Sequence, residues 1–172
     1  CTGDTAKRTG NEFLFQELAK ANIEALSAAT PKTIVTSCPH CLKTIGEDYR
    51  RLGYECRIVH AAVFVAELTK NAPVKAAAGA TVTYHDPCDL GRHCGIYEEP
   101  RETIRRLAPN FVELPHHHAD ALCCGAGGGV RGAYAKNSID MARRRLREVE
   151  ELGAEVVLTE CNSCVHNLGN AK

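Results

Sequence analysis

Residues 33–41 read Thr-Ile-Val-Thr-Ser-Cys-Pro-His-Cys, and residues 156–164 read Val-Val-Leu-Thr-Glu-Cys-Asn-Ser-Cys. In each stretch a short aliphatic and β-branched run, which is typical of a strand, leads directly into a Cys-x-x-Cys motif. Parallel strands that alternate with helices carry their functional groups where the strands end. The two stretches therefore predict an α/β fold with its cysteines at the carboxyl edge of a sheet.

Helical and strand-like segments alternate along the rest of the chain. Apolar residues at helical spacing, ended by proline or glycine, predict helices over residues 11–28, 38–52, 63–70, 100–107 and 137–152. Short runs rich in Ile, Val, Thr and Phe predict strands over residues 33–36, 56–59, 81–84, 111–114 and 156–159. We therefore expect an α/β fold in which a parallel sheet carries helices on both faces.

The spacing of the cysteines indicates an internal repeat. Between Cys1 and Cys38 lie 36 residues, and between Cys124 and Cys161 also lie 36 residues. Both intervals begin with a cysteine, continue through a predicted helix and a strand, and end in Cys-x-x-Cys. This agreement predicts two copies of one structural unit.

The repeat divides the chain into two parts. Residues 71–79 have the Ala, Gly and Pro composition of a linker. We assign residues 1–75 to the C-terminal part of a first copy, truncated at its N-terminus, and residues 76–172 to a second copy. Because the first copy lacks counterparts of Cys88 and Cys123, we expect the chain to be a piece of a longer protein.

Composition excludes several classes of function. The chain of 172 residues has 21 Lys and Arg against 21 Asp and Glu, so it lacks the excess of basic residues that binding to nucleic acid requires. No run approaches the roughly 18 apolar residues of a membrane-spanning helix, so we expect no span in this sequence. Ten cysteines indicate a reducing compartment, and we expect the chain to lie in the cytoplasm or to face it.

Three kinds of site compete for the cysteines. Structural disulfides are disfavoured because adjacent cysteines such as Cys123 and Cys124 form strained bridges. A zinc site suits the Cys-x-x-Cys motifs, but zinc takes four ligands and the second copy offers five. An iron–sulfur centre suits several soft thiolates gathered at strand ends. The five candidate ligands are Cys88, Cys123, Cys124, Cys161 and Cys164.

A glycine-rich loop follows the adjacent cysteines. Residues 123–129 read Cys-Cys-Gly-Ala-Gly-Gly-Gly. Such a loop lets the backbone approach a bulky inorganic ligand and point its amides at sulfides. Gly125 and Gly127 are therefore candidate cofactor-binding residues. The loop lacks the glycine spacing of a dinucleotide site, which argues against a nucleotide ligand.

The spacing Cys-x34-Cys-Cys-x36-Cys-x2-Cys in the second copy resembles the cysteine-rich CCG domain found in the B-type and D-type subunits of heterodisulfide reductase. Related domains occur in iron–sulfur subunits of glycolate oxidase, glycerol-3-phosphate dehydrogenase and lactate utilisation. The motifs at residues 1–4, 38–41 and 85–88 are most similar to single-chain oxidoreductases of the D type. Residues 161–164 lack the proline common after the first cysteine, which alters loop stiffness more than ligation.

The resemblance implies a cofactor and a function. It implies a non-cubane [4Fe–4S] cluster bound by the five cysteines of the second copy, with surviving ligands of the first copy at Cys1, Cys38 and Cys41. It implies an oxidoreductase that passes electrons between a flavoprotein or dehydrogenase and a quinone or disulfide. It also implies an upstream ferredoxin-type region in the parent chain, which is often membrane-associated on the cytoplasmic face.

We expect this segment to be inactive on its own. The alternative, from a different class, is a zinc-binding interaction domain without redox chemistry.

Other cysteines and histidines have plainer interpretations. Cys56 fits no ligand spacing and is expected to pack in a strand. Cys94 is expected to be a bystander, with an accessory ligand or redox thiol as the alternative. For His85, His93 and His40, a proton-donor or supporting role and ordinary loop hydrogen bonding both stay open.

Two groups of charged or titratable residues are expected to be solvated. The three histidines 116–118 point in different directions because they are consecutive, which indicates an exposed loop. Residues 143–151 carry Arg and then Glu at helical spacing, which predicts an exposed helix face with ion pairs.

Overall fold

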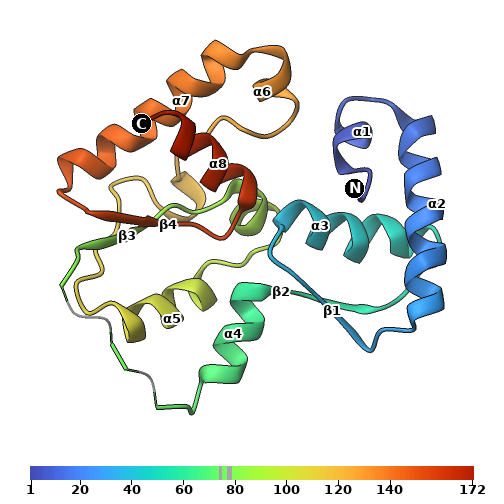
Figure 1. The fold of residues 1–172 in the computed structure, drawn as a ribbon, viewed down its shortest axis with the longest axis horizontal. Coiled ribbons are helices and arrows are strands. Elements are labelled where there is room, and N and C mark those ends of the chain that lie inside the picture. Colours follow the sequence, from blue (N-terminus) through green and yellow to red (C-terminus); the bar gives the residue numbers. More distant parts are fainter. Residues whose placement is uncertain (74, 77–78) are drawn as a thin grey trace.

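Short parallel strands flanked by helices make up the protein, which a computed structural model describes for residues 1–73, 75–76 and 79–172 (Figure 1). The first half contains α1 (Asp4–Arg8), α2 (Glu12–Ala29), β1 (Thr33–Thr36), α3 (Pro39–Lys43), the π-helix η1 (Thr44–Tyr49), β2 (Arg57–His60) and α4 (Ala61–Thr69).

The second half begins with β3 (Val82–Tyr84), the π-helix η2 (Asp89–His93), α5 (Glu98–Leu107) and the 3₁₀-helix η3 (His118–Asp120). It continues with α6 (Val130–Ala133), α7 (Ala135–Glu151), β4 (Val156–Leu158) and α8 (Asn162–Asn170). The predicted α/β class is confirmed, and all the named strands pair in parallel.

The strands divide between two sheets, whereas the sequence predicted one. β1 pairs with β2, and β3 pairs with β4. The contacts that join the two halves come from helices, since α4 packs against α5 and α3 packs against η2 (Figure 1). Each half therefore keeps its own pair of strands.

The predicted strand over residues 111–114 is wrong. Phe111 forms an isolated bridge with Val82, and the Val112 amide donates to the Val82 carbonyl at 2.9 Å. The pairing does not continue past these residues, and the next side chain, Glu113, accepts a hydrogen bond of 2.7 Å from Arg101.

The internal repeat is visible in the order of the elements. α1–α2–β1–α3 and α6–α7–β4–α8 are the same succession of short helix, long helix, strand and helix (Figure 1). Gly3 and Gly129, with φ of 86° and 80°, precede the two short helices. This left-handed conformation is one that glycine adopts without strain.

The division between residues 75 and 76 stays a prediction. Each sheet lies on one side of it. The predicted linker over residues 71–79 includes residues 74, 77 and 78, which lie outside the described residues.

A buried ion pair anchors the loop after β3. Arg101 of α5 is fully buried and makes two hydrogen bonds of 2.7 Å to the carboxylate of Asp86. Its guanidinium also contacts Glu113 and lies 5.1 Å from the ring of Tyr84. The paired geometry compensates the cost of burying the charges.

The expectation that residues 143–151 are solvated is wrong at two positions. Arg145 has no exposed side-chain surface, and Glu148 is also buried. Arg145 falls on the same helical stripe as the buried residues Ala142 and Val149, and it forms an ion pair with Glu148. Residues three or four positions apart share one face of a helix, and this face of α7 is buried. Arg145 is therefore buried with its neighbours on that face.

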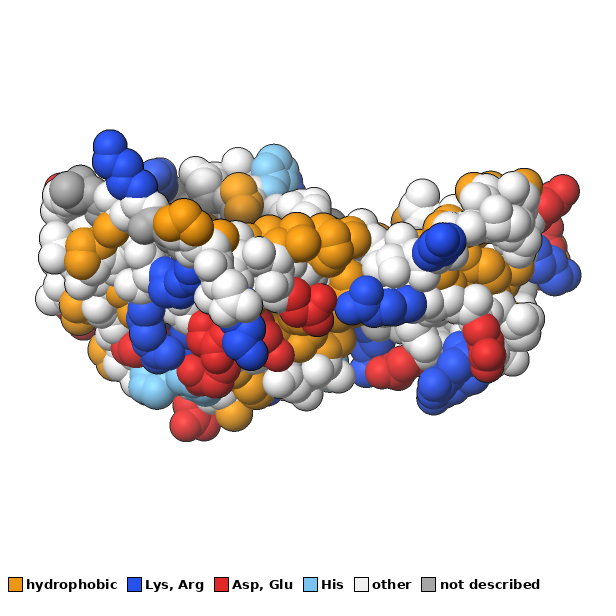
Figure 2. Space-filling model, turned by 90° about the horizontal axis from the view of Figure 1, so that it is seen from below, with side chains coloured by type: hydrophobic (Ala, Val, Ile, Leu, Met, Phe, Trp, Pro, Cys, Tyr) orange, Lys and Arg blue, Asp and Glu red, His pale blue; other side chains and the backbone are white. Residues whose placement is uncertain are grey.

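Charges are mixed on the surface. On the face in Figure 2, Lys and Arg side chains lie among Asp and Glu side chains, in keeping with the equal counts. None of the helices in the described ranges has both the length and the apolar character needed to cross a bilayer.

Replacing Arg101 by leucine should lower the free energy of unfolding by about 3–5 kcal/mol, because it strands the buried carboxylate of Asp86. Urea denaturation measures the change. Arg105→Leu is the matched control, since Arg105 lies on the same helix with a half-exposed side chain and should contribute at most about 1 kcal/mol. Equal losses in the two variants would contradict the role given to the buried pair.

Candidate functional site

Parallel pairing of β3 with β4 brings two distant cysteine motifs to one edge. Tyr84 is in register with Leu158, and the His85 amide extends the ladder by donating to the Leu158 carbonyl at 2.8 Å. The loop that holds Cys88 and the loop that begins at Cys161 therefore leave the sheet side by side. This is the carboxyl edge that the sequence predicted.

The five predicted ligands of the second copy come together at this edge. We call them the thiol cluster: Cys88, Cys123, Cys124, Cys161 and Cys164. The sulfur atoms of Cys124 and Cys164 are 3.2 Å apart. A small cavity is lined by Cys88, Cys124, Cys161 and Cys164. Side-chain contacts with Cys124 and Cys88 tie Cys123 to the same group.

Thiol–thiol contacts split the pKa values of the cluster. Contacts with Cys124 and Cys88 lower the pKa of Cys123 to about 2, and the same contacts raise the pKa of Cys88 and of Cys124. The pKa of Cys161 falls to about 5 through its contact with Cys164. The pKa of Cys164 is raised by its contacts with Cys124 and Cys161. Cys123 and Cys161 therefore favour the thiolate, which is the form that binds metal, and the other three cysteines favour the thiol.

The glycine-rich loop packs closely against α7. Gly125 has a φ of 83°, and a Cβ atom there would lie 2.6 Å from the carbonyl oxygen of Ser138. The Gly125 amide donates to the sulfur of Cys123 at 3.3 Å. Gly127 lines the small cavity, where its open side faces the ring of His40. Gly125 thus serves helix packing and Gly127 the cavity wall.

Asn167 of α8 holds the loop in place. Its amide nitrogen donates to the carbonyl oxygens of Cys124 at 2.6 Å and Ser138 at 3.2 Å. Ser138 returns a hydroxyl hydrogen bond to Asn167 at 3.2 Å. Asn167 was not among the residues expected from the sequence, although its position three residues after Cys164 places it on the same helix face.

The three cysteines of the first copy line a neighbouring cavity of about 570 Å³. Cys1, Cys38 and Cys41 share it with Arg8 and Arg131. The two cavities have four lining residues in common, which are His40, Ala126, Gly127 and Ser163. The two sets of cysteines therefore line two adjacent cavities and do not share one.

An ionic bridge that the sequence analysis missed joins the two halves. Asp89 of η2 accepts hydrogen bonds from Arg8 of α1 and, at 3.0 Å, from the Nε2 of His40. Asp89 first, and then Cys161 and Cys38, raise the pKa of His40 to about 12. Burial opposes ionisation of Asp89, but the bonds from His40 and Arg8 hold its pKa below the usual range. A charged histidine thus lies between the two cavities.

His85 is buried beside the thiol cluster. A ring nitrogen of His85 and the sulfurs of Cys124 and Cys164 all lie within 4.8 Å of one another. Its Nδ1 accepts a hydrogen bond of 3.1 Å from Nε of Arg145, and its Nε2 has no partner. Burial first, and then the charge of Arg145, lower the pKa of His85 to about 3. The ring is neutral.

The other candidates lie apart from the thiol cluster. Cys56 is half-buried and donates to the carbonyl of Pro31. Cys94 and the exposed His93 line neither cysteine cavity. Residues 116–118 form the expected surface loop, in which His116 and His118 contact acidic side chains.

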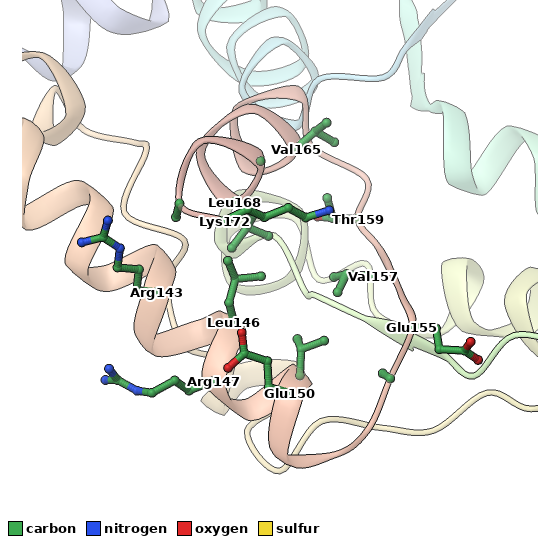
Figure 3. A pocket seen from close by; sticks show the side chains of 14 residues that line it. Arg143, Leu146, Arg147, Glu150, Glu155, Val157, Thr159, Val165, Leu168 and Lys172 are labelled. Atoms are coloured by element: carbon green, nitrogen blue, oxygen red, sulfur yellow. The ribbon is translucent and has the colours of Figure 1, made fainter.

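A third cavity, of about 770 Å³, has no cysteine in its lining. It lies among α7, α8 and β4, with Leu146, Val157 and Val165 in its lining and charged side chains around it (Figure 3). Size alone is a poor guide here, because the chemically reactive side chains gather in the two smaller cavities.

The profile of the cysteine-rich domain family (CCG) matches residues 1–46 and 82–169. The chain belongs to this family. The two matched segments fall on either side of the predicted linker. The family membership suggested by the cysteine spacing is thereby confirmed.

Known relatives align with almost the whole chain. It is 34% identical to the D-type subunit of dihydromethanophenazine:CoB–CoM heterodisulfide reductase from Methanosarcina mazei, over 98% of this chain and 43% of the relative. It is 34% identical to the probable iron–sulfur-binding oxidoreductase FadF of Bacillus subtilis, over 98% of this chain and 24% of FadF. It is 32% identical to the EtfAB:quinone oxidoreductase of Syntrophomonas wolfei, over 96% of this chain and 24% of that protein.

The chain thus spans less than half the length of these three relatives. Nothing in the family or in their names supports the zinc alternative.

Replacing Gly125 by alanine should destabilise the fold by more than about 1 kcal/mol, because alanine is strained at this φ and its Cβ would overlap the backbone of α7. Gly132→Ala is the control, since nothing lies within 4 Å of the added atom. Thermal unfolding of both variants measures the effect. A Gly125→Ala variant as stable as the control would show that the loop does not pack as described.

Proposed function

We propose that the thiol cluster binds an iron–sulfur cluster and that this segment transfers electrons within an oxidoreductase. The observation that carries the proposal is the convergence of Cys88, Cys123, Cys124, Cys161 and Cys164 at one sheet edge. Five soft thiol ligands exceed the four of a tetrahedral zinc site and suit iron. The names of the three relatives, which are oxidoreductases or parts of them, support the same class of function.

The residues present fit such a group. The lowered pKa values of Cys123 and Cys161 favour the thiolate at these two ligands, whereas Cys88, Cys124 and Cys164 have raised pKa values and would release protons on binding metal. The sulfurs of Cys124 and Cys164 are 3.2 Å apart, and bonds to metal would take the place of this contact between the two thiols. The Nε2 of His85 is a buried polar atom without a hydrogen-bond partner, and a bound group with an acceptor atom would supply one.

We propose a non-cubane [4Fe–4S] cluster. Adjacent cysteines cannot easily direct both side chains to one iron of a compact cubane. In this structure the Cys123 and Cys124 side chains contact each other, and each also contacts a different third cysteine, Cys88 for Cys123 and Cys164 for Cys124. An open cluster with five protein ligands accommodates this arrangement.

When bound, an iron–sulfur cluster accepts and releases single electrons. The protein's own groups would bind it and compensate its charge. The five sulfurs are the ligands, the Gly125 amide points at one of them, and the charged His40 lies beside the Cys161 sulfur. Positive charge and amide dipoles favour the more negative, reduced state.

We propose that the cysteines of the first copy belong to a second site of the same kind. Cys1, Cys38 and Cys41 offer three of five ligands. We propose that the parent supplies the others together with an upstream ferredoxin-type region. A flavoprotein or dehydrogenase would be the electron donor, and a quinone or disulfide the acceptor. Ten thiols favour a reducing compartment such as the cytoplasm.

Anaerobic reconstitution with iron and sulfide tests the proposal. The wild-type chain should turn brown and contain iron and acid-labile sulfide in similar amounts. Cys124→Ser should lose or convert the cluster, because an open iron site is readily lost to oxygen or chelators. Cys56→Ser is the matched control and should keep the wild-type spectrum.

Two outcomes would sink the proposal. One is a colourless protein that binds stoichiometric zinc in preference to iron. The other is a Cys124→Ser variant whose iron content and electron paramagnetic resonance spectrum equal those of the wild type.

A further inference from the structure

His85 stands apart from the five cysteines in its chemistry. It is 1% exposed, and one of its ring nitrogens lies within 4.8 Å of the Cys124 and Cys164 sulfurs. Every buried polar atom requires a partner or costs free energy, yet Nε2 has none. The other ring nitrogen, Nδ1, is already occupied by Arg145. The unpaired nitrogen could therefore either bind metal or donate a hydrogen bond.

The contact with Arg145 decides between these roles. The guanidinium of arginine has N–H donors and no acceptor, so Nδ1 of His85 must accept the hydrogen bond. In a neutral ring the proton then sits on Nε2. A histidine that ligates metal through Nε2 instead carries its proton on Nδ1 and donates it to a carboxylate or carbonyl. Arg145 is the wrong partner for a ligand and the right partner for a donor.

Arg145 is itself held in position. Its Nη1 donates to the carbonyl of His116 at 2.7 Å and forms a buried ion pair with Glu148. Both contacts fix the guanidinium on α7 with its Nε directed at His85. The tautomer of His85 is therefore set by a network that contains none of the thiol ligands.

We propose that His85 donates a hydrogen bond from Nε2 to a sulfur of the bound iron–sulfur cluster, and that Arg145 is the positioning residue that holds the ring in the donating tautomer. The inference rests on the proposed function, because it requires the cluster. Reduction adds negative charge to the sulfurs, so a donor stabilises the reduced form more than the oxidised form. His85 thereby raises the reduction potential.

Replacement of His85 tests this donor. Asparagine can still accept from Arg145 through its oxygen but is too short to reach the cluster. Glutamine reaches further and can restore an N–H donor. His93→Asn is the control, because His93 is exposed and lines neither cysteine cavity.

In an anaerobic redox titration followed by electron paramagnetic resonance, His85→Asn should lower the equilibrium constant for one-electron reduction about tenfold, which corresponds to 59 mV. His85→Gln should recover part of this loss, and His93→Asn should match the wild type. Iron content should be the same in all variants. An unchanged potential in His85→Asn with its cluster intact would overturn the inference.

Two further measurements keep the test independent of cluster assembly. In reduced, cluster-free protein with isotope-labelled histidine, nitrogen–proton correlation spectra should assign the proton of His85 to Nε2. A proton on Nδ1 would overturn the inference, and this measurement does not require bound iron. Failure of the chain to bind iron would instead refute the proposed function. In the loaded protein, strong hyperfine coupling from a histidine nitrogen would make His85 a ligand and would also contradict the donor role.

Discussion

The parallel ladder between β3 and β4 is the constraint on which the candidate site depends. It holds Tyr84 opposite Leu158 and continues through the amide of His85. Two segments far apart in the sequence thus leave the sheet at one edge. Because antiparallel pairing would send them to opposite ends, the parallel direction is what makes a shared thiol site possible.

Buried charges then hold the loops that carry the ligands. Arg101 fixes Asp86, and Arg145 fixes His85, so two residues shortly before Cys88 are held by arginines from separate helices. An arginine suits this task because its guanidinium donates in several directions at once. The loop after β3 is therefore anchored to α5 and α7 by hydrogen bonds from buried arginines.

The two copies of the repeat meet where their cysteine motifs meet. His40, in the first Cys-x-x-Cys loop, contacts Asp89, which follows Cys88 of the second copy. The side chain of His40 also contacts Cys38 of its own motif and Cys161 of the second motif, and these contacts together with Asp89 raise its pKa. Each copy thereby contributes to the electrostatic environment of the other.

The sequence by itself determined the family, the α/β class and the choice of candidate ligands, because these follow from periodicity and from cysteine spacing along the chain. Only the tertiary structure decided that residues 111–114 form an isolated bridge and not a strand. It also decided the burial of Arg145 and the partners of His85 and Asp89. These depend on contacts between segments far apart in sequence, and local patterns carry no information on which charged side chains will meet.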